Sequence, residues 1–418
     1  MPEAIKKHDP YSALRFKEFR YFFIARLLLT LAFQVQVIVI NWMAYEHTHD
    51  PWTLGIMGLI EAVPIMVVSL FGGHYADKFN RRKIIVVSIF ILIAGSAYLT
   101  WFAHNGTEHL QQYGVMPVFI VVLIIGIARG FLGPAIPAFS AQLIPKEFYT
   151  NAAAWNSTVW QLGSVTGPAI GGICYGIFGA STTSFIALLL MFATVVFYML
   201  ISNKPVPEKL KEESMFESLK AGIKFVFKNE VIISAITLDL FAVLFGGAVA
   251  MLPVFADQVL HTGPEGLGYL RAAPALGAVI MAVVLAYFPP LRNSGRKLLW
   301  SVTMFGLCMI GFALSKNFIL SFVMLLLSGI FDSVSVVIRH TIIQIFTPDE
   351  MRGRVSAVNS IFIGASNEIG AFESGLTAKL MGLIPSVIAG GVATLLVVAG
   401  AYKFAPRLKK MQLSRHTA

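Results

Sequence analysis

Charged residues are scarce in this chain. Of its 418 residues, 13% are Asp, Glu, Lys or Arg and 56% are hydrophobic. A soluble domain needs about 25% charged residues to cover its surface. The composition therefore excludes a water-soluble protein and predicts one that resides in a membrane.

Cysteines and nucleotide-binding motifs are lacking as well. The two cysteines, Cys174 and Cys308, fall in apolar runs, so we predict neither disulfides nor a metal site. No Gly-Lys pair occurs in the chain, which excludes the phosphate-binding loop that an ATP-driven pump requires. We expect no cofactor and no enzymatic activity.

Long apolar runs are what the chain has instead. A helix needs about 20 residues to cross a hydrocarbon layer of ~30 Å, and barrel strands would show shorter, alternating segments. The sequence predicts an all-α polytopic membrane protein with twelve transmembrane helices. The expected spans are 21–45, 53–74, 84–103, 116–139, 152–177, 181–202, 231–256, 266–288, 298–315, 318–345, 355–378 and 385–402.

The cations predict the orientation of these spans. With both termini in the cytoplasm, 26 of the 32 Lys and Arg residues fall on the inner side, and only Lys316 and Lys379 fall outside. This distribution obeys the positive-inside rule. The net charge of +10 therefore reflects topology and does not indicate a nucleic-acid partner.

One long polar segment divides the spans six and six. We expect an N-terminal six-helix bundle at residues 1–202, a cytoplasmic linker at 203–230 and a C-terminal six-helix bundle at 231–418. Within the linker, apolar residues repeat at helical spacing from Met215 to Phe227, and Lys220 and Lys224 lie on another face. This pattern favours an amphipathic helix in the membrane interface, with an ordinary linker as the alternative.

The two halves repeat one another. At an offset of 203 residues, the segment 143–157 matches 346–360 and the same register continues through three glycine pairs. The matched pairs are Pro145/Pro348, Glu147/Glu350, Asn156/Asn359, Ser157/Ser360, Gly167/Gly370, Gly172/Gly375 and Gly179/Gly382. A second match, at offset 210, places residues 58–64 over 268–274. The fifth and eleventh spans are therefore equivalent, as are the second and eighth, in two parallel pseudo-symmetric halves.

A compact polar motif, GGHYADKFNRRK at 72–83, separates the second and third spans. Its Gly-Gly pair allows the end of one helix to approach a neighbour closely, and its aspartate can accept hydrogen bonds from a helix N-terminus or from an arginine. The equivalent segment of the second half, YFPPLRNSGRK at 287–297, keeps the basic end but lacks the glycine pair and the aspartate.

This motif resembles the signature of the major facilitator superfamily, G-x-x-x-D-R-x-G-R-R. The matching residues are Gly73, Asp77, Lys78, Asn80, Arg81 and Arg82, with Lys for the first Arg and Asn for the second Gly. The resemblance covers essentially the whole chain and is greatest to the branch of enterobactin exporters and macrolide-efflux proteins. It implies proton-driven export of small molecules. It also implies a cytoplasmic gate in which Asp77 latches onto the start of the eleventh span, near Arg352 and Arg354. The alternative is that these cations only enforce topology.

A second motif lies in the fifth span. GSVTGPAIGG at 163–172 is similar to the antiporter motif of the same superfamily, with matches at Gly163, Gly167, Pro168, Gly171 and Gly172. Three of these glycines recur every four residues on one face, and the proline permits a bend. We expect a close, pliable contact between the halves here, and the motif favours an exporter over an importer.

Charged residues inside the spans are the candidate mechanistic groups, because each is costly in lipid unless it faces a partner or water. They are Arg26, Glu61, Arg129, Asp239, Arg271, Asp332, Arg339, Glu368 and Glu373. None lies in the third, sixth, ninth or twelfth span. We therefore predict that those four helices face lipid and that the other eight surround a polar cavity.

Equivalent positions in the two halves carry charges of opposite sign. Asp332 is equivalent to Arg129 and Arg271 to Glu61, while Arg26 and Asp239 lie at nearly equal depth in the first and seventh spans. One hypothesis is that the halves attract each other across the cavity until a proton or a substrate weakens the attraction. The alternative is that each charge is satisfied within its own half, as Asp332 and Arg339 could be.

Proton coupling requires a carboxylate that can be protonated in a dry, alternately exposed site. The candidates are Asp239, Glu368 and Glu373, followed by Glu61. Possible polar contacts to substrate are Gln34, Gln36, Asn41 and Gln161. The abundance of Phe and Met, 33 and 16 residues, indicates an adaptable apolar cavity for amphiphilic cargo.

The sequence thus predicts a monomeric, proton-coupled exporter of small amphiphilic molecules in the bacterial inner membrane. Its expected partners are a small-molecule substrate, protons and the lipid bilayer. Proton-coupled uptake and a non-transporting membrane receptor with the same fold remain as alternatives.

Overall fold

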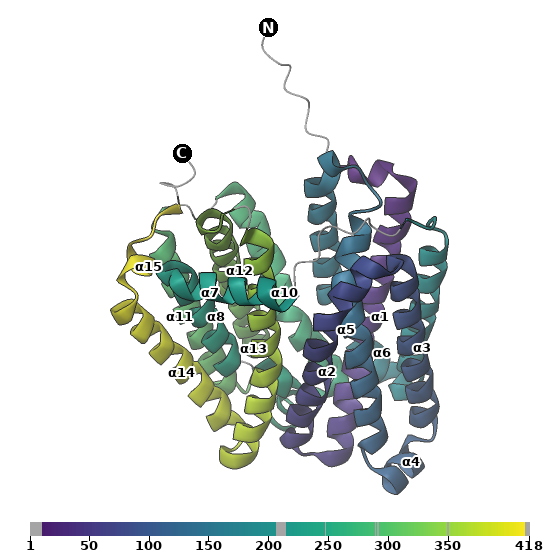
Figure 1. The fold of residues 1–418 in the computed structure, drawn as a ribbon. Coiled ribbons are helices and arrows are strands. Elements are labelled where there is room, and N and C mark those ends of the chain that lie inside the picture. Colours follow the sequence, from purple (N-terminus) through teal and green to yellow (C-terminus); the bar gives the residue numbers. More distant parts are fainter. Residues whose placement is uncertain are drawn as a thin grey trace.

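Helices dominate the structure, as predicted. The computed structural model describes residues 11–205, 215–246, 248–288, 290, 292–348 and 351–413, and this part contains no strand (Figure 1). The helices of the N-terminal half are η1 (Ala13–Arg15), α1 (Lys17–Thr48), α2 (Pro51–Lys78), α3 (Arg81–His104), α4 (Gly106–Tyr113), α5 (Met116–Ser140), η2 (Lys146–Phe148) and α6 (Tyr149–Met199).

The helices of the C-terminal half begin after the polar segment. They are α7 (Met215–Lys228), α8 (Glu230–Phe245), η3 (Ala248–Met251), α9 (Leu252–Val254), η4 (Phe255–Val259), α10 (Gly263–Tyr287), α11 (Ser294–Leu314), α12 (Phe318–Phe346), α13 (Arg352–Met381), α14 (Leu383–Phe404) and α15 (Pro406–Lys410).

Ten segments of the described chain are long and apolar enough to cross a membrane, against the twelve predicted. Two physical features account for the difference. The helix α6 is 51 residues long, which exceeds twice the length that one crossing needs, and Gly179 interrupts it with a non-helical backbone at φ 77° and ψ 177°. The helix α13 has 30 residues but is less apolar than the other long helices.

The backbone repeats between the halves where the sequence does. Gly382, the equivalent of Gly179 at offset 203, adopts φ 92° and ψ 159° between α13 and α14. These positive φ values are open to glycine and strained for other residues. A sharp break thus follows the equivalent helix in each half.

Helices of the two halves pack on each other most extensively in two places. Helix α6 contacts α10, and α2 contacts α13, so each contact joins a helix of one half to a helix of the other. Figure 1 shows the purple-to-blue helices of the first half on one side and the green-to-yellow helices of the second on the other. These two helix pairs therefore position the interface at which a central site can form.

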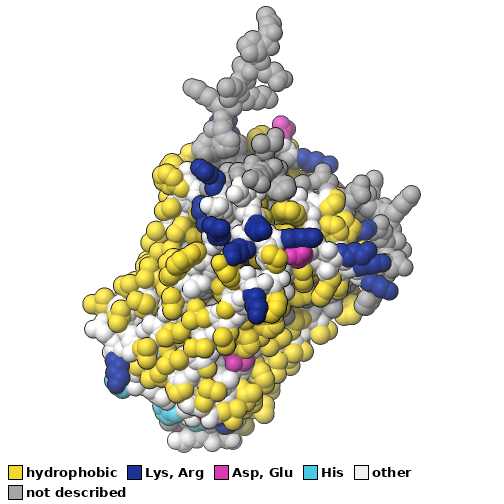
Figure 2. All heavy atoms as spheres, turned by 90° about the vertical axis from the view of Figure 1, so that its left-hand side faces the viewer, with side chains coloured by type: hydrophobic (Ala, Val, Ile, Leu, Met, Phe, Trp, Pro, Cys, Tyr) yellow, Lys and Arg dark blue, Asp and Glu magenta, His cyan; other side chains and the backbone are white. Residues whose placement is uncertain are grey.

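The ends of the molecule differ in charge. Figure 2 shows Lys and Arg side chains gathered in the upper part of the visible face, above a broad hydrophobic surface. The short helix α4 lies at the opposite end, at the bottom of Figure 1. We call the end that holds the turn at residues 78–83 the cationic end and the other the closed end.

The linker contains a helix where an amphipathic helix was expected. Its C-terminal part, α7, runs across the other helices and packs on α13 and α8 (Figure 1). Val226 is buried, whereas Phe227 is 61% exposed and Ile223 is 40% exposed. Residues 206–214 and the side chains of 215–219 lie outside the described part. The described side chains thus give α7 an inner face and an exposed apolar face.

Candidate functional site

A central cavity of about 720 Å³ lies between the two halves. Its wall is mostly apolar, with contributions from α1, α2, α5 and α6 on one side and from α8, η3, α10, α11, α12 and α13 on the other. Among the polar residues predicted from sequence, seven line it: Gln34, Gln36, Asn41, Glu61, Arg129, Arg271 and Asp332. The volume suits a small organic molecule.

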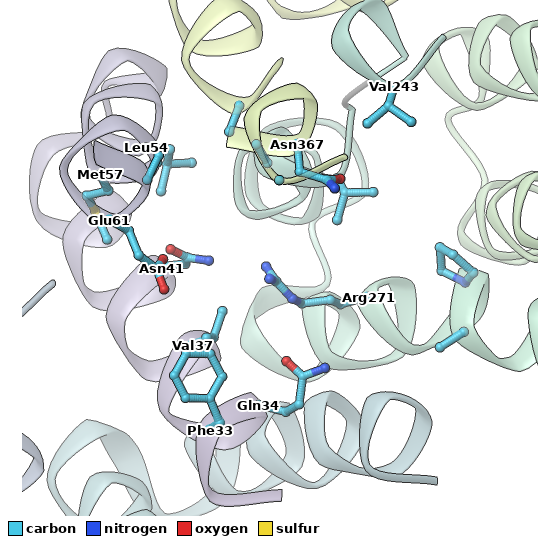
Figure 3. Close-up of a pocket in the computed structure, with 18 of the residues that line it drawn as sticks. Phe33, Gln34, Val37, Asn41, Leu54, Met57, Glu61, Val243, Arg271 and Asn367 are labelled. Atoms are coloured by element: carbon cyan, nitrogen blue, oxygen red, sulfur yellow. The ribbon is translucent and has the colours of Figure 1, made fainter. Parts of the chain in front are cut away.

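Polar groups face one another across this cavity. Figure 3 shows Arg271 extending from α10 toward the side where Glu61 and Asn41 lie, with Gln34 and Asn367 on either flank. Asn367 was not predicted as a site residue. The prediction considered the charged residues of this helix but not its amides. An amide inside an apolar span also indicates a polar partner or water, although burying it costs less free energy than burying a charge.

Glu61 forms its ion pair within its own half. Arg129 of α5 donates to the Glu61 carboxylate of α2, and the Arg129 guanidinium lies over the Phe33 ring at 4.4 Å from its centroid. The side chains of Arg129 and Glu61 are 33% and 21% exposed. Glu61 is therefore neutralised locally, as the alternative to attraction across the cavity requires.

The charged residues of the second half are paired differently from those of the first. Asp332 lines the cavity on α12 but makes no hydrogen bond or ion pair with any other described side chain. Its expected partner, Arg339, instead donates to Asp239 of α8, and the side chains of this pair are each 6% exposed. The pairing of Arg339 with Asp239 was not predicted. It joins two helices, and the spacing of residues along the sequence does not determine how two helices are rotated relative to each other.

Three other predicted residues lie away from the cavity wall. Arg26 stacks over the ring of Trp160, which lines the cavity, at 5.9 Å from the ring centroid. Glu373 is half-buried on α13. Gln161 is half-buried and donates to Ser157 on its own helix, which argues against substrate contact in this state. The side chain of Glu368 lies outside the described part.

The prediction that the ninth span faces lipid is wrong in part. Helix α11 places Phe305 and Met309 in the cavity wall, whereas α3, α14 and the part of α6 after Gly179 contribute no residue to it. The reason is visible at Gly246, just after α8 ends: a Cβ there would lie 2.4 Å from the Phe305 ring. A glycine at this point lets Phe305 reach the cavity past the end of α8.

The glycine stripe of the fifth span packs differently from the prediction. A Cβ at Gly167 would lie 2.6 Å from the Cβ of Gln34 on α1, so this face fits against a helix of its own half. Gly163 and Gly171 face α1 in the same way. The next glycine, Gly172, meets the other half at Gly268 of α10, as does Gly176 beyond the motif, at Glu265 of the same helix. The motif thus combines packing within a half with one contact between halves.

The motif at 72–83 binds helix ends. Arg81 donates to the carbonyl oxygens of Ala76 and Ala138, each at 3.0 Å, and Arg82 donates to that of Met199 at 2.8 Å. These carbonyls lie at or near the C-termini of α2, α5 and α6, where the helix dipole favours a cation. Asn80 caps α3 by accepting from the Lys83 N–H at 3.1 Å. The motif therefore ties together three helix ends of the first half.

Only one glycine of this pair, Gly72, packs closely against a neighbouring helix in the described part of the chain. A Cβ at Gly72 would lie 2.8 Å from the Gly130 carbonyl oxygen on α5, as the prediction of a close approach requires. Gly73 has nothing within 4 Å of that position, so it makes no such contact. Lys78 lies over the Phe79 ring at 6.0 Å. The side chains of Asp77 and Arg352 lie outside the described part.

Polar contacts between the halves gather at the closed end. Tyr45 donates to Asp257 at 3.3 Å, and Lys379 pairs with Asp50 at 3.4 Å. His49 lies 4.0 Å from Asp257. These three contacts between described residues of opposite halves all lie at the same end of the molecule. Polar contacts therefore join the two halves on this side of the cavity.

Comparison with known proteins gives matches over nearly the whole chain. A family model described as a transmembrane secretion effector matches residues 8–417. The enterobactin exporter EntS of Shigella dysenteriae serotype 1 (strain Sd197) is 25% identical over 380 residues, which cover 91% of this chain and 89% of that protein.

Solved structures share the fold at low sequence identity. A D-xylose–proton symporter is 14% identical with a TM-score of 0.74, over 95% of this chain and 100% of that one. A bacterial homologue of the human lysosomal transporter Spinster, in an inward-facing and unoccupied conformation, is 14% identical with a TM-score of 0.72, over 94% of this chain and 98% of that one.

Proposed function

Since this chain belongs to the transmembrane secretion effector family of the major facilitator superfamily, we propose that it exports small amphiphilic molecules in exchange for protons. The chain is a multi-pass membrane transporter and not an enzyme. The observation that carries the proposal is the mainly apolar cavity between the halves, with charged side chains in its wall.

The cargo is proposed from the chemistry of that wall. Phe33, Trp160 and Met309 offer adaptable apolar contact, and Arg271, Asn41 and Asn367 offer polar groups at separate points. An amphiphilic molecule matches this mixture, since its apolar body and its polar groups each find partners. The likeness to enterobactin exporters supports a siderophore-like or drug-like compound.

The proposed architecture has twelve membrane-spanning helices in two six-helix bundles. The break at Gly179 divides α6 into two spans, and α13, equivalent to the first of them, adds another to the ten apolar segments. Both termini are then cytoplasmic, in the bacterial inner membrane, and the cationic end faces the cytoplasm. The contacts at the closed end make this an inward-facing state.

The motif at 72–83 is proposed to act when the protein faces outward. Arg81 and Arg82 hold helix ends of the first half together close to Asp77 in the sequence. Closure of the cytoplasmic side would bring this motif to the start of α13, where Arg352 and Arg354 lie. The latch engages there as the closed end opens.

Transport in proteoliposomes tests the function and its direction. A catechol siderophore, a macrolide and a lipid-like amphiphile are offered outside vesicles with an acidic lumen and, separately, with an alkaline lumen. Exchange for protons drives uptake only into acidic vesicles, with about tenfold accumulation per pH unit for one-for-one exchange. Uptake only into alkaline vesicles would show symport. If no compound moved in either gradient, the result would contradict the proposed function. Protein-free vesicles serve as the control.

A further inference from the structure

A second, much smaller cavity lies behind the wall of the central one. Its volume is about 10 Å³, and it lies between α8, α11 and α12. Asp332 lines both cavities, and Asp239 lines only the small one. Asp332 thus connects the open central space with the buried pair of Asp239 and Arg339.

In the described part of the chain, one polar atom without a hydrogen-bond partner lines this small cavity, and another lies near it on the same helix. The Ser335 hydroxyl lines it and, among the described residues, has no hydrogen-bond partner. The Nε of Arg339, one helical turn further along α12, is likewise buried and unpaired within the described chain. A cavity of about 10 Å³ holds about one water molecule, which needs two to four polar partners. Asp239, Asp332 and Ser335 supply them.

We propose that one water molecule occupies the small cavity and passes protons between Asp332 and Asp239. This inference rests on the proposed proton coupling and names its route. A proton from the central cavity first binds the Asp332 carboxylate. Asp332 then gives that proton to the water oxygen, while the water gives one of its own to Asp239. The net change is an ionised Asp332 and a neutral Asp239, with only O–H bonds exchanged.

The charge of the cluster explains why it would take one proton. Asp239, Asp332 and Arg339 together carry one excess negative charge when both carboxylates are ionised, and burying an unbalanced charge is costly. One bound proton makes the cluster neutral. The other described charged groups nearby are His340, which is exposed beside Arg339 on α12, and Arg271 on α10, which lines the central cavity with Asp332.

Protonation of Asp239 would loosen the contact between two helices. Arg339 then loses its partner on α8 and keeps only the more distant Asp332, seven residues away on its own helix and about 10.5 Å along the axis. Both helices also line the central cavity, through Val243 and Ser328. The proton therefore changes the wall against which substrate binds.

Infrared difference spectroscopy tests the relay without a substrate. Purified protein is moved from a mildly alkaline to an acidic buffer, and the carboxyl C=O band that appears is recorded with its rise time. Asp332→Asn is the principal variant, because it leaves the Asp239–Arg339 pair intact and makes the cluster neutral without a proton. The band from this cluster should disappear in Asp332→Asn. The double variant Asp239→Asn/Arg339→Gln leaves Asp332 as the one excess negative charge, so it should keep a band, at the frequency of the Asp332 carboxyl group.

The role of the water is tested by the rate at which the carboxyl C=O band rises. Ser335→Ala should keep the band but slow its rise about tenfold, since one of the groups that holds the water is gone. Ser333→Ala is the matched control, because Ser333 does not line the small cavity, and it should behave as the unaltered protein. An unchanged band in Asp332→Asn, or equal rise times for the two serine variants, overturns the relay.

The outcome separates the relay from the transport function. If the band depends on Asp332 while no compound crosses the vesicle membrane in either gradient, the proposed function fails and the relay stands. If compounds are exchanged for protons while the band does not depend on Asp332, the function stands and protons travel by another route.

Discussion

Two ion pairs account for half of the described charged residues inside the spans, and the two pairs differ in their surroundings. Glu61 and Arg129 face the central cavity, where water screens them, whereas Asp239 and Arg339 are nearly inaccessible. A buried charge that loses its partner keeps its full desolvation penalty, while an exposed one is solvated again. The two pairs should therefore respond differently to the loss of one member.

Removing one partner from the buried pair should be far more harmful than removing both. Asp239→Asn leaves Arg339 buried without its carboxylate and should lower the free energy of unfolding by about 3–5 kcal/mol. The double variant Asp239→Asn/Arg339→Gln removes both charges and should recover most of that loss. Thermal unfolding in detergent measures both.

The cavity-facing pair provides the comparison. Glu61→Gln leaves Arg129 over the Phe33 ring and within reach of water, so its effect on unfolding should be about 1 kcal/mol or less. Equal destabilisation by Asp239→Asn and Glu61→Gln would show that burial does not distinguish the two pairs.

At the scale of helices, glycine contacts separate packing within a half from packing between halves. Gly167 fits α6 against α1, and Gly172 fits it against α10 of the other half. The equivalent of Gly172 in the second half, Gly375, meets Gly55 of α2 in the same manner. The two halves thus touch at two pseudo-symmetric glycine contacts near the closed end.

Adding a methyl group at the contact between halves should shift the conformational equilibrium. A Cβ at Gly172 would lie 2.5 Å from the Pro264 carbonyl oxygen and 2.7 Å from the Gly268 Cα, both backbone atoms of α10. Overpacking of about 1–3 kcal/mol should lower the ratio of inward-facing to outward-facing protein by at least about fivefold. The readout is the labelling rate of Gly364→Cys in the cavity wall, with Cys174 and Cys308 replaced by Ser.

Two glycine variants are the controls for this shift. Gly133→Ala has nothing within 4 Å of its new methyl group and should not change labelling. Gly167→Ala meets α1 inside one half and should lower thermal stability instead. Equal labelling in Gly172→Ala and Gly133→Ala would contradict a role for Gly172 in closing the halves.

The exposed apolar face of α7 should lie in the lipid interface. A spin label at Phe227→Cys is expected to be relaxed mainly by oxygen, which partitions into lipid, and one at Lys224→Cys mainly by a water-soluble nickel complex. The same accessibility at both positions would contradict an interfacial helix.

The sequence predicted the helices well and their mutual rotation poorly. Apolar length and cation placement marked the spans, and the offset of 203 residues located the equivalent breaks at Gly179 and Gly382. The pairing of Asp239 with Arg339 could not be predicted, because it depends on how α8 and α12 turn toward each other. The entry of Phe305 into the cavity depends likewise on where α8 ends.

At the scale of the whole molecule, one cavity lies between two halves that are joined at one end. Tyr45, His49 and Asp50 of the first half contact Asp257 and Lys379 of the second, all at the closed end. Transport by alternating access requires these contacts to separate in every cycle. In the proposed cycle, the motif at 72–83 would couple that separation to closure at the other end, and the small cavity behind Asp332 would couple it to protons.

Locking the closed end measures this requirement most directly. Asp50→Cys and Lys379→Cys, in a background without Cys174 and Cys308, are joined in proteoliposomes by a short reducible thiol cross-linker. Glu46→Cys and Tyr175→Cys, which face each other at the same end but within one half, are the matched control pair. The account predicts that the lock between halves abolishes proton-driven transport and that reductant restores it, while the control pair transports throughout. Undiminished transport by the protein locked across Asp50 and Lys379 would contradict it.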